Sequence, residues 1–218
     1  EILGLAGLMG AGRTEVARAI FGADPRDSGE IWVNGKRAGI SSPQDAVRAG
    51  IGYLSEDRKH FGLATGLDVR NNIALASLER FVGPGGVIKD GAMHEVAEKY
   101  IRQLSIKTPS DTQEARLLSG GNQQKVVIGK IIATNPRVML LDEPSRGIDV
   151  GAKGEVFRLL AERARQGVAV VYSTSEVGEC LSIAHRIIVM RRGKISAEFT
   201  PDATKDMIMA ASGEAVAA

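Results

Sequence analysis

The sequence predicts an α/β fold with a mainly parallel sheet flanked by helices, an inserted helical subdomain and an antiparallel edge. Short apolar runs, typical of buried strands, alternate with segments whose apolar residues recur at helical spacing. Between about His60 and Leu117 the strand pattern stops and helical stretches take over, with a glycine-rich break at residues 83–86. We therefore expect a core of residues 1–59 and 118–218 and a helical subdomain of residues 60–117.

The individual elements follow from these patterns. Two of the expected strands, 29–33 and 194–199, alternate apolar and polar residues, which indicates edge or antiparallel strands. The Ala-rich end, residues 210–218, is expected to be poorly ordered. The other expected strands are residues 2–6, 51–54, 138–141, 168–172 and 186–190. The expected helices are residues 13–21, 46–49, 93–104, 123–133 and 153–165.

Composition narrows the class of protein. The 28 basic and 26 acidic residues nearly cancel, which argues against nucleic acid as a partner. The single cysteine, Cys180, cannot form an internal disulfide, so we expect a reducing compartment and a small apolar packing role. No run approaches the ~18 apolar residues of a membrane span, and no secretory signal opens the chain. Because Glu1 leads at once into a strand pattern, we expect a fragment of a longer protein.

The first expected strand runs into a glycine-rich turn before the first helix. The pattern Gly-x4-Gly-Lys-Ser/Thr in this context binds phosphates through backbone N–H groups, and its final hydroxyl binds Mg²⁺. Arg13 stands where that pattern has lysine, and we expect its broad planar fork to fit inside the loop less well than a compact ammonium. A plain strand–helix turn is the alternative; a dinucleotide fingerprint is disfavoured because Glu15 occupies its third glycine position. The candidate nucleotide-contacting residues are Gly7, Met9, Gly10, Ala11, Gly12, Arg13, Thr14 and Glu15.

An acidic pair follows the apolar run at residues 138–141. Asp142 at the end of this strand could hold Mg²⁺ indirectly, and Glu143 could orient and deprotonate an attacking water. The alternative is a buried strand that ends in a solvated acidic pair.

A third motif stands about twenty residues before the acidic pair. Ser119 and the two glycines after it precede a predicted helix, whose first N–H groups would form an anion site together with the serine hydroxyl. A loop with an ordinary helix cap is the alternative for this segment taken alone. The candidate residues are Ser119, Gly120, Gly121 and Asn122.

Taken together, the three motifs resemble those of ATP-binding-cassette ATPases over nearly the whole chain. Residues 118–122 match the family signature Leu-Ser-Gly-Gly-Gln, with Asn122 replacing Gln. Phosphate loop, helical insert, signature and acidic strand also come in the family's order, and residues 147–149 resemble the loop that follows. The resemblance implies a P-loop NTPase core that binds ATP and Mg²⁺. It also implies that Asp149 faces a partner cassette.

The chain is most similar to the second (C-terminal) cassette of ribose/galactose/xylose-type sugar importers, in which two cassettes are fused. This resemblance implies a nucleotide-binding domain of a bacterial monosaccharide importer, on the cytoplasmic face of the inner membrane. The implied partners are the first cassette, permease subunits and, indirectly, a periplasmic sugar-binding protein. The stretches that carry it are residues 7–15, 55–59, 118–125, 142–144 and 146–153.

Three positions depart from the active family pattern. The family's coupling glutamine, which senses Mg²⁺, falls on Glu56, and its switch histidine falls on Ser175. A serine hydroxyl is shorter than imidazole and carries no positive charge. With Arg13, these substitutions imply a degenerate nucleotide site in this chain, whereas the intact signature would serve the partner cassette. The resemblance gives Glu143, Ser175 and Glu56 catalytic roles, and Thr14, Asp142 and Glu56 roles at the metal.

Other interpretations remain open. An N-terminal hairpin, with the aromatic residue that stacks on adenine in this family, is expected to lie upstream of this chain. One alternative is a regulatory half that binds ATP without hydrolysis. It differs from the main interpretation only in whether ATP is hydrolysed at the site that contains Arg13. A soluble, non-transport cassette ATPase would be expected to keep the lysine and to show a basic surface. A P-loop nucleotide kinase is disfavoured, because the signature at residues 118–122 has no role in that class of enzyme.

Overall fold

The structure, a computed structural model, describes residues 1–213, which divide into two compact units. The sheet unit comprises Glu1–Glu56, Arg137–Pro144 and the chain from Leu160 onward. The helical unit comprises Asp57–Pro136 and Ser145–Leu159. The expected division differs, since it assigned residues 57–59, 118–136 and 145–159 to the core. In the described part of the chain, no helix is both long and apolar enough to cross a membrane.

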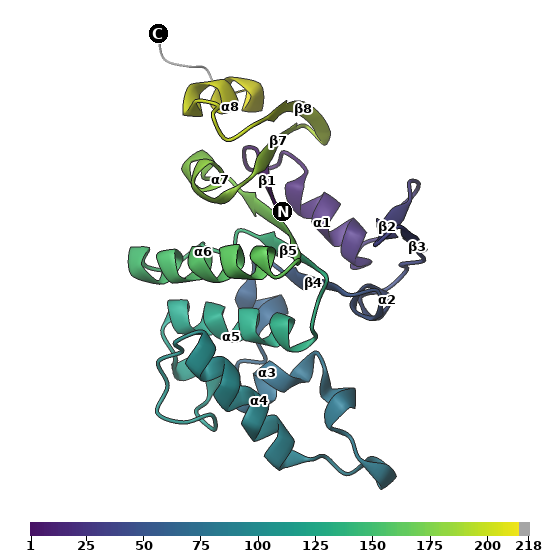
Figure 1. Cartoon of the computed structure of the whole chain (residues 1–218), viewed down its shortest axis with the longest axis vertical. Coiled ribbons are helices and arrows are strands. Elements are labelled where there is room, and N and C mark those ends of the chain that lie inside the picture. The colour runs from purple at the N-terminus through teal and green to yellow at the C-terminus, as the bar shows by residue number, and fades with distance from the viewer. Residues whose placement is uncertain (214–218) are drawn as a thin grey trace. The chain divides into compact units, whose positions relative to one another are not determined.

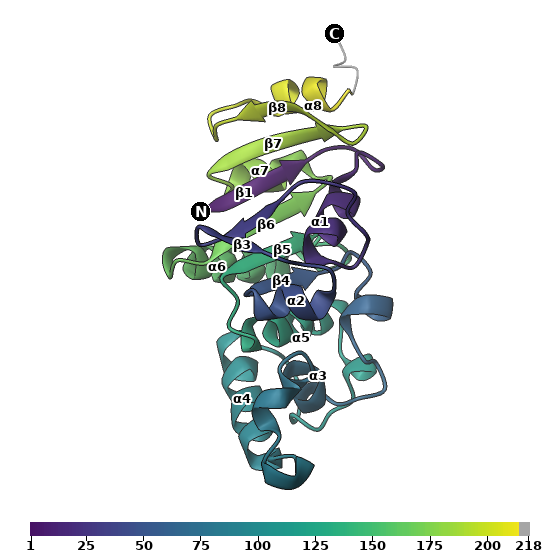
Figure 2. The same cartoon turned by 90° about the vertical axis from the view of Figure 1, so that its right-hand side faces the viewer.

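Six strands form the main sheet, in the order β4-β5-β6-β1-β7-β8 (Figures 1 and 2). All neighbouring pairs are parallel except β7 and β8, which confirms the parallel sheet and its antiparallel edge. The strands are β1 (Ile2–Ala6), β4 (Ile51–Leu54), β5 (Val138–Asp142), β6 (Ala169–Thr174), β7 (Arg186–Arg191) and β8 (Lys194–Phe199).

A small hairpin stands apart from this sheet. β2 (Ile31–Val33) pairs with β3 (Lys36–Ala38) in an antiparallel two-stranded sheet. The strand expected at residues 29–33 is thus shorter than predicted. Its partner was not predicted, because Lys36 and Arg37 are exposed and give no apolar pattern.

Four helices belong to the sheet unit, and Figure 2 shows them on its two faces. An added Cβ on Gly4 would lie 3.1 Å from the Cys180 sulfur on α7, so this face of β1 packs against α7. The opposite face of the sheet packs against α1 and α2, which contribute Ile20, Phe21 and Ala46 to a shared apolar cluster. The helices are α1 (Arg13–Phe21), α2 (Pro43–Arg48), α7 (Val177–Ile183) and α8 (Lys205–Ser212).

Helix α8 corrects one expectation. Residues 210–212 were expected to be poorly ordered, but they form its last turn. Thr204 caps this helix, and Ile208 is fully buried beside β7, so packing stabilises a segment that composition alone marked as a tail. Residues 214–218, the rest of that expected tail, lie outside the described part.

The helical unit contains short helical turns and three packed helices. Ala74, Phe81 and Met93 form its apolar cluster. The helix after Ser119 begins at Gly120, three residues earlier than expected, because the Ser119 side chain caps it. The elements are η1 (Arg58–Gly62), α3 (Val69–Leu75), η2 (Leu78–Phe81), η3 (Pro84–Gly86), α4 (Asp90–Gln103), η4 (Ala115–Leu117) and α5 (Gly120–Ala133). α6 (Val150–Arg165) crosses the division between the units.

Candidate functional site

Strand register brings three of the sequence motifs to one edge of the sheet. β6 lies between β1 and β5, and all three strands are parallel. Ala6 pairs with Thr174, and Asp142 pairs with Ser173. The glycine-rich loop, the acidic pair and the segment around Ser175 therefore all leave the sheet at its carboxyl edge, where ligands bind in open α/β sheets.

The glycine-rich loop is open to an anion. An added Cβ on Gly7 would lie 2.6 Å from the Met190 carbonyl oxygen, so this position accepts only glycine. At the tip, Met9 is 83% exposed. Within residues 1–213 the amide hydrogens of Gly10 and Gly12 have no protein acceptor. Gly12 precedes α1 with a φ of 98°, so these free donors stand at a helix N-terminus.

Hydroxyl and carboxylate oxygens that could bind Mg²⁺ lie where this loop ends. Thr14 Oγ1 donates to Asp142 Oδ2 at 2.7 Å, and Ser173 Oγ donates to Asp142 Oδ1 at 2.9 Å. Burial raises the pKa of Asp142, and the two hydrogen bonds oppose that shift. A hydroxyl beside a carboxylate is a donor set that suits Mg²⁺.

Arg13 does not point at the loop's open tip but at the predicted catalytic base. Its Nη2 lies 2.8 Å from Glu143 Oε1, and the two side chains are only 7% and 10% exposed. Its Nη1 donates to Ser173 Oγ at 3.0 Å, whereas its buried Nε has no hydrogen-bond partner. The fork of the arginine thus holds two residues at once, each through a separate nitrogen.

Hydrogen bonds from its neighbours fix the position of Glu143. Its backbone adopts a φ of 47°, unusual for a residue other than glycine. The Ser175 amide donates to Oε1 at 2.7 Å, and Thr174 Oγ1 lies 3.3 Å from Oε2. Strained backbone of this kind collects at functional sites. In this structure the carboxylate is therefore paired with Arg13 and hydrogen-bonded to Ser175 and Thr174.

The two remaining departures from the family pattern occupy the same edge. Ser175 follows β6 and is exposed, and its backbone is what reaches Glu143. Glu56 follows the edge strand β4, so β5 and β6 separate that strand from β1. The catalytic roles of Ser175 and Glu56, and the metal role of Glu56, remain predictions.

The signature forms a second donor group, in the helical unit. Ser119 is exposed, and its Oγ accepts from Asn122 Nδ2 at 3.0 Å. Asn122 Oδ1 accepts from the Lys107 amide at 2.8 Å, so the substituted residue orients the serine. The first-turn amides of Gly120 and Gly121 have no acceptor among the described residues. They lie at the positive end of the 14-residue helix α5.

Asp149 lies next to this donor group. An added Cβ on Gly121 would lie 3.5 Å from Asp149 Oδ2. Asp149 Oδ1 accepts from the Ala152 amide at 2.9 Å, and this backbone hydrogen bond lowers the pKa of Asp149. The carboxylate is therefore ionised and caps the start of α6.

Two residues of the site were not singled out from the sequence. Ser173 links Arg13 to Asp142, and Thr174 contacts both Glu143 and Glu179. Their hydroxyls end a strand that is otherwise apolar, a signal that could have identified them.

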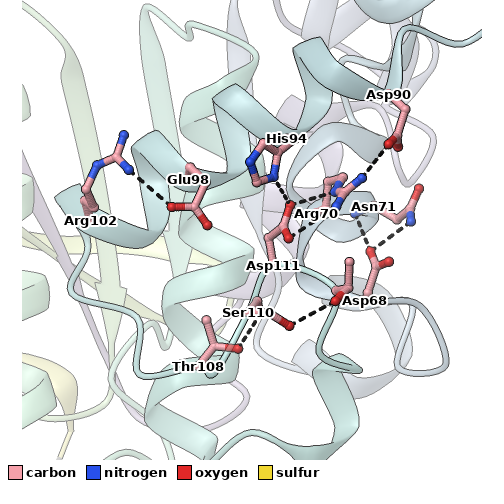
Figure 3. A network of polar contacts seen from close by, with 11 residues as sticks. Asp68, Arg70, Asn71, Asp90, His94, Glu98, Arg102, Thr108, Ser110 and Asp111 are labelled. Atoms are coloured by element: carbon pink, nitrogen blue, oxygen red, sulfur yellow. Dashed lines mark hydrogen bonds and ion pairs between the residues drawn. The ribbon is translucent and has the colours of Figure 1, made fainter.

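A cluster of possible metal ligands occurs elsewhere, in the helical unit (Figure 3). Atoms of His94, Glu98 and Asp111 lie within 4.8 Å of one another. However, Arg70 donates to both oxygens of Asp111, from Nε at 2.6 Å and from Nη2 at 3.2 Å. The Arg70 hydrogen bonds lower the pKa of Asp111. The Arg70 guanidinium already balances the charge of Asp111 and also pairs with Asp90, so these contacts favour a structural role for the cluster.

Comparison with known proteins identifies a family. The sequence profile of the family described as "ABC transporter" matches residues 1–146. Two known structures of a dimeric ATP-binding cassette, one of them bound to ADP and Pi, share the fold with TM-scores of 0.79. They are 20% and 21% identical, and the match covers 94% of this chain and 87% of theirs.

Curated relatives are much closer in sequence. A putative ribose/galactose/methyl galactoside import ATP-binding protein of Burkholderia lata is 60% identical over 210 residues. A xylose import ATP-binding protein of Thermoanaerobacter pseudethanolicus is 51% identical, and a ribose import ATP-binding protein of Bacillus subtilis is 49% identical. Each match covers 96% of this chain but only 41–42% of the relative. The chain thus spans about two fifths of the length of these relatives.

Proposed function

Because the chain belongs to the ATP-binding-cassette transporter family, we propose that it is a nucleotide-binding domain of a bacterial monosaccharide importer, which couples ATP hydrolysis to sugar uptake. The import functions of the relatives support this proposal. Its partners would be the first cassette, the permease subunits and, through them, a periplasmic sugar-binding protein. The site of action would be the cytoplasmic face of the inner membrane.

The residues of the glycine-rich loop fit ATP and Mg²⁺. The free amides of Gly10 and Gly12 would bind phosphate oxygens, and Thr14 with Asp142 would hold the metal. Mg²⁺, when bound, supplies positive charge that offsets the charge developing on the phosphates. Glu143 remains in place to orient water, but its ion pair with Arg13 must first open.

We propose a division of labour between the two donor groups of this chain. The observation that carries it is the buried Arg13–Glu143 ion pair. A base whose charge is already neutralised makes the chain's own nucleotide site slow or inactive. The signature around Ser119 has open donors instead, and it would complete the ATP site of the first cassette, where it stabilises charge in the transition state.

The Arg13–Glu143 pair also favours a second candidate. In that case the chain binds ATP as a regulatory half and does not hydrolyse it. Phosphate release from the own site separates the two candidates.

The test compares two variants of the complete importer in sugar-uptake assays. Ser119→Ala should lower ATP-driven uptake by about tenfold or more, because it removes a donor to the transferred phosphate. Arg13→Gln should lower uptake less, since the own site contributes little turnover. Greater loss in Arg13→Gln than in Ser119→Ala would contradict the division.

Folding must be controlled in this comparison. Arg13→Gln leaves the buried Glu143 without a cation, which costs about 3 kcal/mol or more. The double variant Arg13→Gln/Glu143→Gln removes both charges and therefore avoids this penalty. The melting temperatures of all variants decide which of the two enters the comparison.

A further inference from the structure

Arg58 lies against the signature. It is the first residue of η1, and its guanidinium stands over Gly120: an added Cβ there would lie 2.8 Å from Arg58 Nη2. An added Cβ on Gly147 would lie 3.4 Å from Arg58 Nη1. Nη1 donates to the Arg146 carbonyl oxygen at 2.9 Å. All of these residues belong to the helical unit.

The charge of this guanidinium is not balanced locally. Within residues 1–213, no carboxylate forms an ion pair with Arg58, and its buried Nε has no hydrogen-bond partner. The carboxylate of the preceding residue, Asp57, instead accepts from the Lys59 amide and from the amide and ring of His60.

Two sources of positive potential therefore meet beside Gly120. One is the guanidinium of Arg58, and the other is the N-terminus of α5 with its open amides. Bringing them together without an anion is unfavourable, so the arrangement is that of a site prepared for an anion.

We propose that Arg58 is part of the nucleotide site formed by the signature, where it binds the terminal phosphate of a nucleoside triphosphate held by the partner cassette. This inference rests on the proposed function of the signature. A guanidinium presents a planar fork that matches two phosphate oxygens. The hydroxyl of Ser119 and the amides of Gly120 and Gly121 supply the other donors. Because a nucleoside diphosphate lacks the terminal phosphate, Arg58 selects the triphosphate over the diphosphate.

The geometry also gives a reason for the glycine at position 120. A side chain there would collide with the Arg58 guanidinium at 2.8 Å and with the Gly147 carbonyl oxygen at 2.9 Å. Because Gly120 has no side chain, it leaves room for the Arg58 guanidinium and for a phosphate group.

The test uses ATPase assays on the complete importer with ATP as substrate and ADP as competitor. Arg58→Gln should raise the KM for ATP about tenfold, because a charge-assisted donor to the terminal phosphate is lost. Inhibition by ADP should stay within about twofold of the parent. Arg58→Lys should recover part of the loss. The matched control is Lys59→Gln, which removes the same charge from the exposed neighbouring residue and should leave both constants unchanged.

A purely structural role, through the bond to Arg146, predicts a different pattern. It would lower the melting temperature, or change the ATP and ADP constants equally. Either result overturns the inference, as does an unchanged KM for ATP in Arg58→Gln. If Arg58→Gln does not fold, Arg58→Met, which keeps the apolar stem, replaces it.

Ser119→Ala in the same assay separates this inference from the proposed function. A loss of activity in Ser119→Ala with none in Arg58→Gln overturns only the role of Arg58. No loss in either variant overturns the role of the signature, and the role of Arg58 with it.

Discussion

At the scale of single residues, one substitution reorganises the nucleotide site. Arg13 keeps the positive charge of the family's lysine but uses it on Glu143 and Ser173. Both contacts depend on a side chain with several donors in one plane. The guanidinium charge of Arg13 therefore pairs with a protein carboxylate instead of facing a bound phosphate.

Asp142 gives a prediction at the same scale. Burial raises its pKa above the ordinary value of about 4. As the pH rises, the Asp142 carboxyl group therefore loses its proton in the unfolded chain before it does so in the folded protein. Because the folded state holds the proton longer, the free energy of unfolding decreases as the pH rises through the folded-state pKa. Asp142→Asn has no such titration. The melting temperature of the parent, relative to Asp142→Asn, should fall as the pH rises above about 4 when measured without Mg²⁺.

The control for Asp142 is Asp24→Asn. Asp24 is partly exposed, and its hydrogen bonds from the Arg18 side chain lower its pKa. Its titration therefore carries the opposite sign, because stability that depends on the Asp24 carboxylate is lost as the pH falls. A parent-to-variant difference for Asp142 that grows with pH would refute the assignment of a destabilised carboxylate.

At the scale of elements, α5 shows how a helix is fixed so that its N-terminus can act. Gln123 donates to the Ala115 carbonyl oxygen, and Lys125 donates to that of Ser105. Lys130 donates to the carbonyl oxygen of Gly62 in η1. These long side chains tie α5 to the loops around it, so the first turn can leave its amides open.

Asn72 on α3 plays the same part for the loop before that helix. It is fully buried, accepts from the Ala64 amide and donates to the carbonyl oxygens of Ala64, Leu67 and Asp68. Asn72→Ala leaves the buried Ala64 amide without its acceptor and removes one donor from each of the three carbonyl oxygens, so it should lower the free energy of unfolding by about 3 kcal/mol, measured by urea denaturation.

The neighbouring Asn71 provides the matched control. Its side chain makes one hydrogen bond, to Asp68, in a partly buried position. Asn71→Ala should lower the free energy of unfolding by about 1 kcal/mol or less. Equal effects of the two substitutions would show that the buried network does not hold the loop.

At the scale of the whole molecule, each unit carries one donor group. The glycine-rich loop belongs to the sheet unit and the signature to the helical unit. In the proposed division of labour, every complete ATP site needs a glycine-rich loop from one cassette and a signature from another. One chain alone therefore supplies halves of two different sites.

This organisation predicts a concentration dependence. The ATPase rate per molecule of the purified chain should be low at nanomolar concentration and should rise when the first cassette is added. The measurement is phosphate release at fixed, saturating ATP. Rapid turnover that stays constant on dilution would show that a single chain completes its own site.

Local patterns along the chain were enough to predict some of its elements and motifs. Apolar runs located β1 and β4 to the residue, and glycine spacing located the two donor groups. The tertiary structure decided what those patterns do together. Arg13 is 130 residues from Glu143 and 160 from Ser173, so only the register of β1, β5 and β6 brings their side chains into contact. Likewise, Arg58 meets Gly120 and Gly147 only because η1, α5 and the loop before α6 pack together. Such contacts leave no periodic signal in a chain, because packing and hydrogen bonding in three dimensions select them.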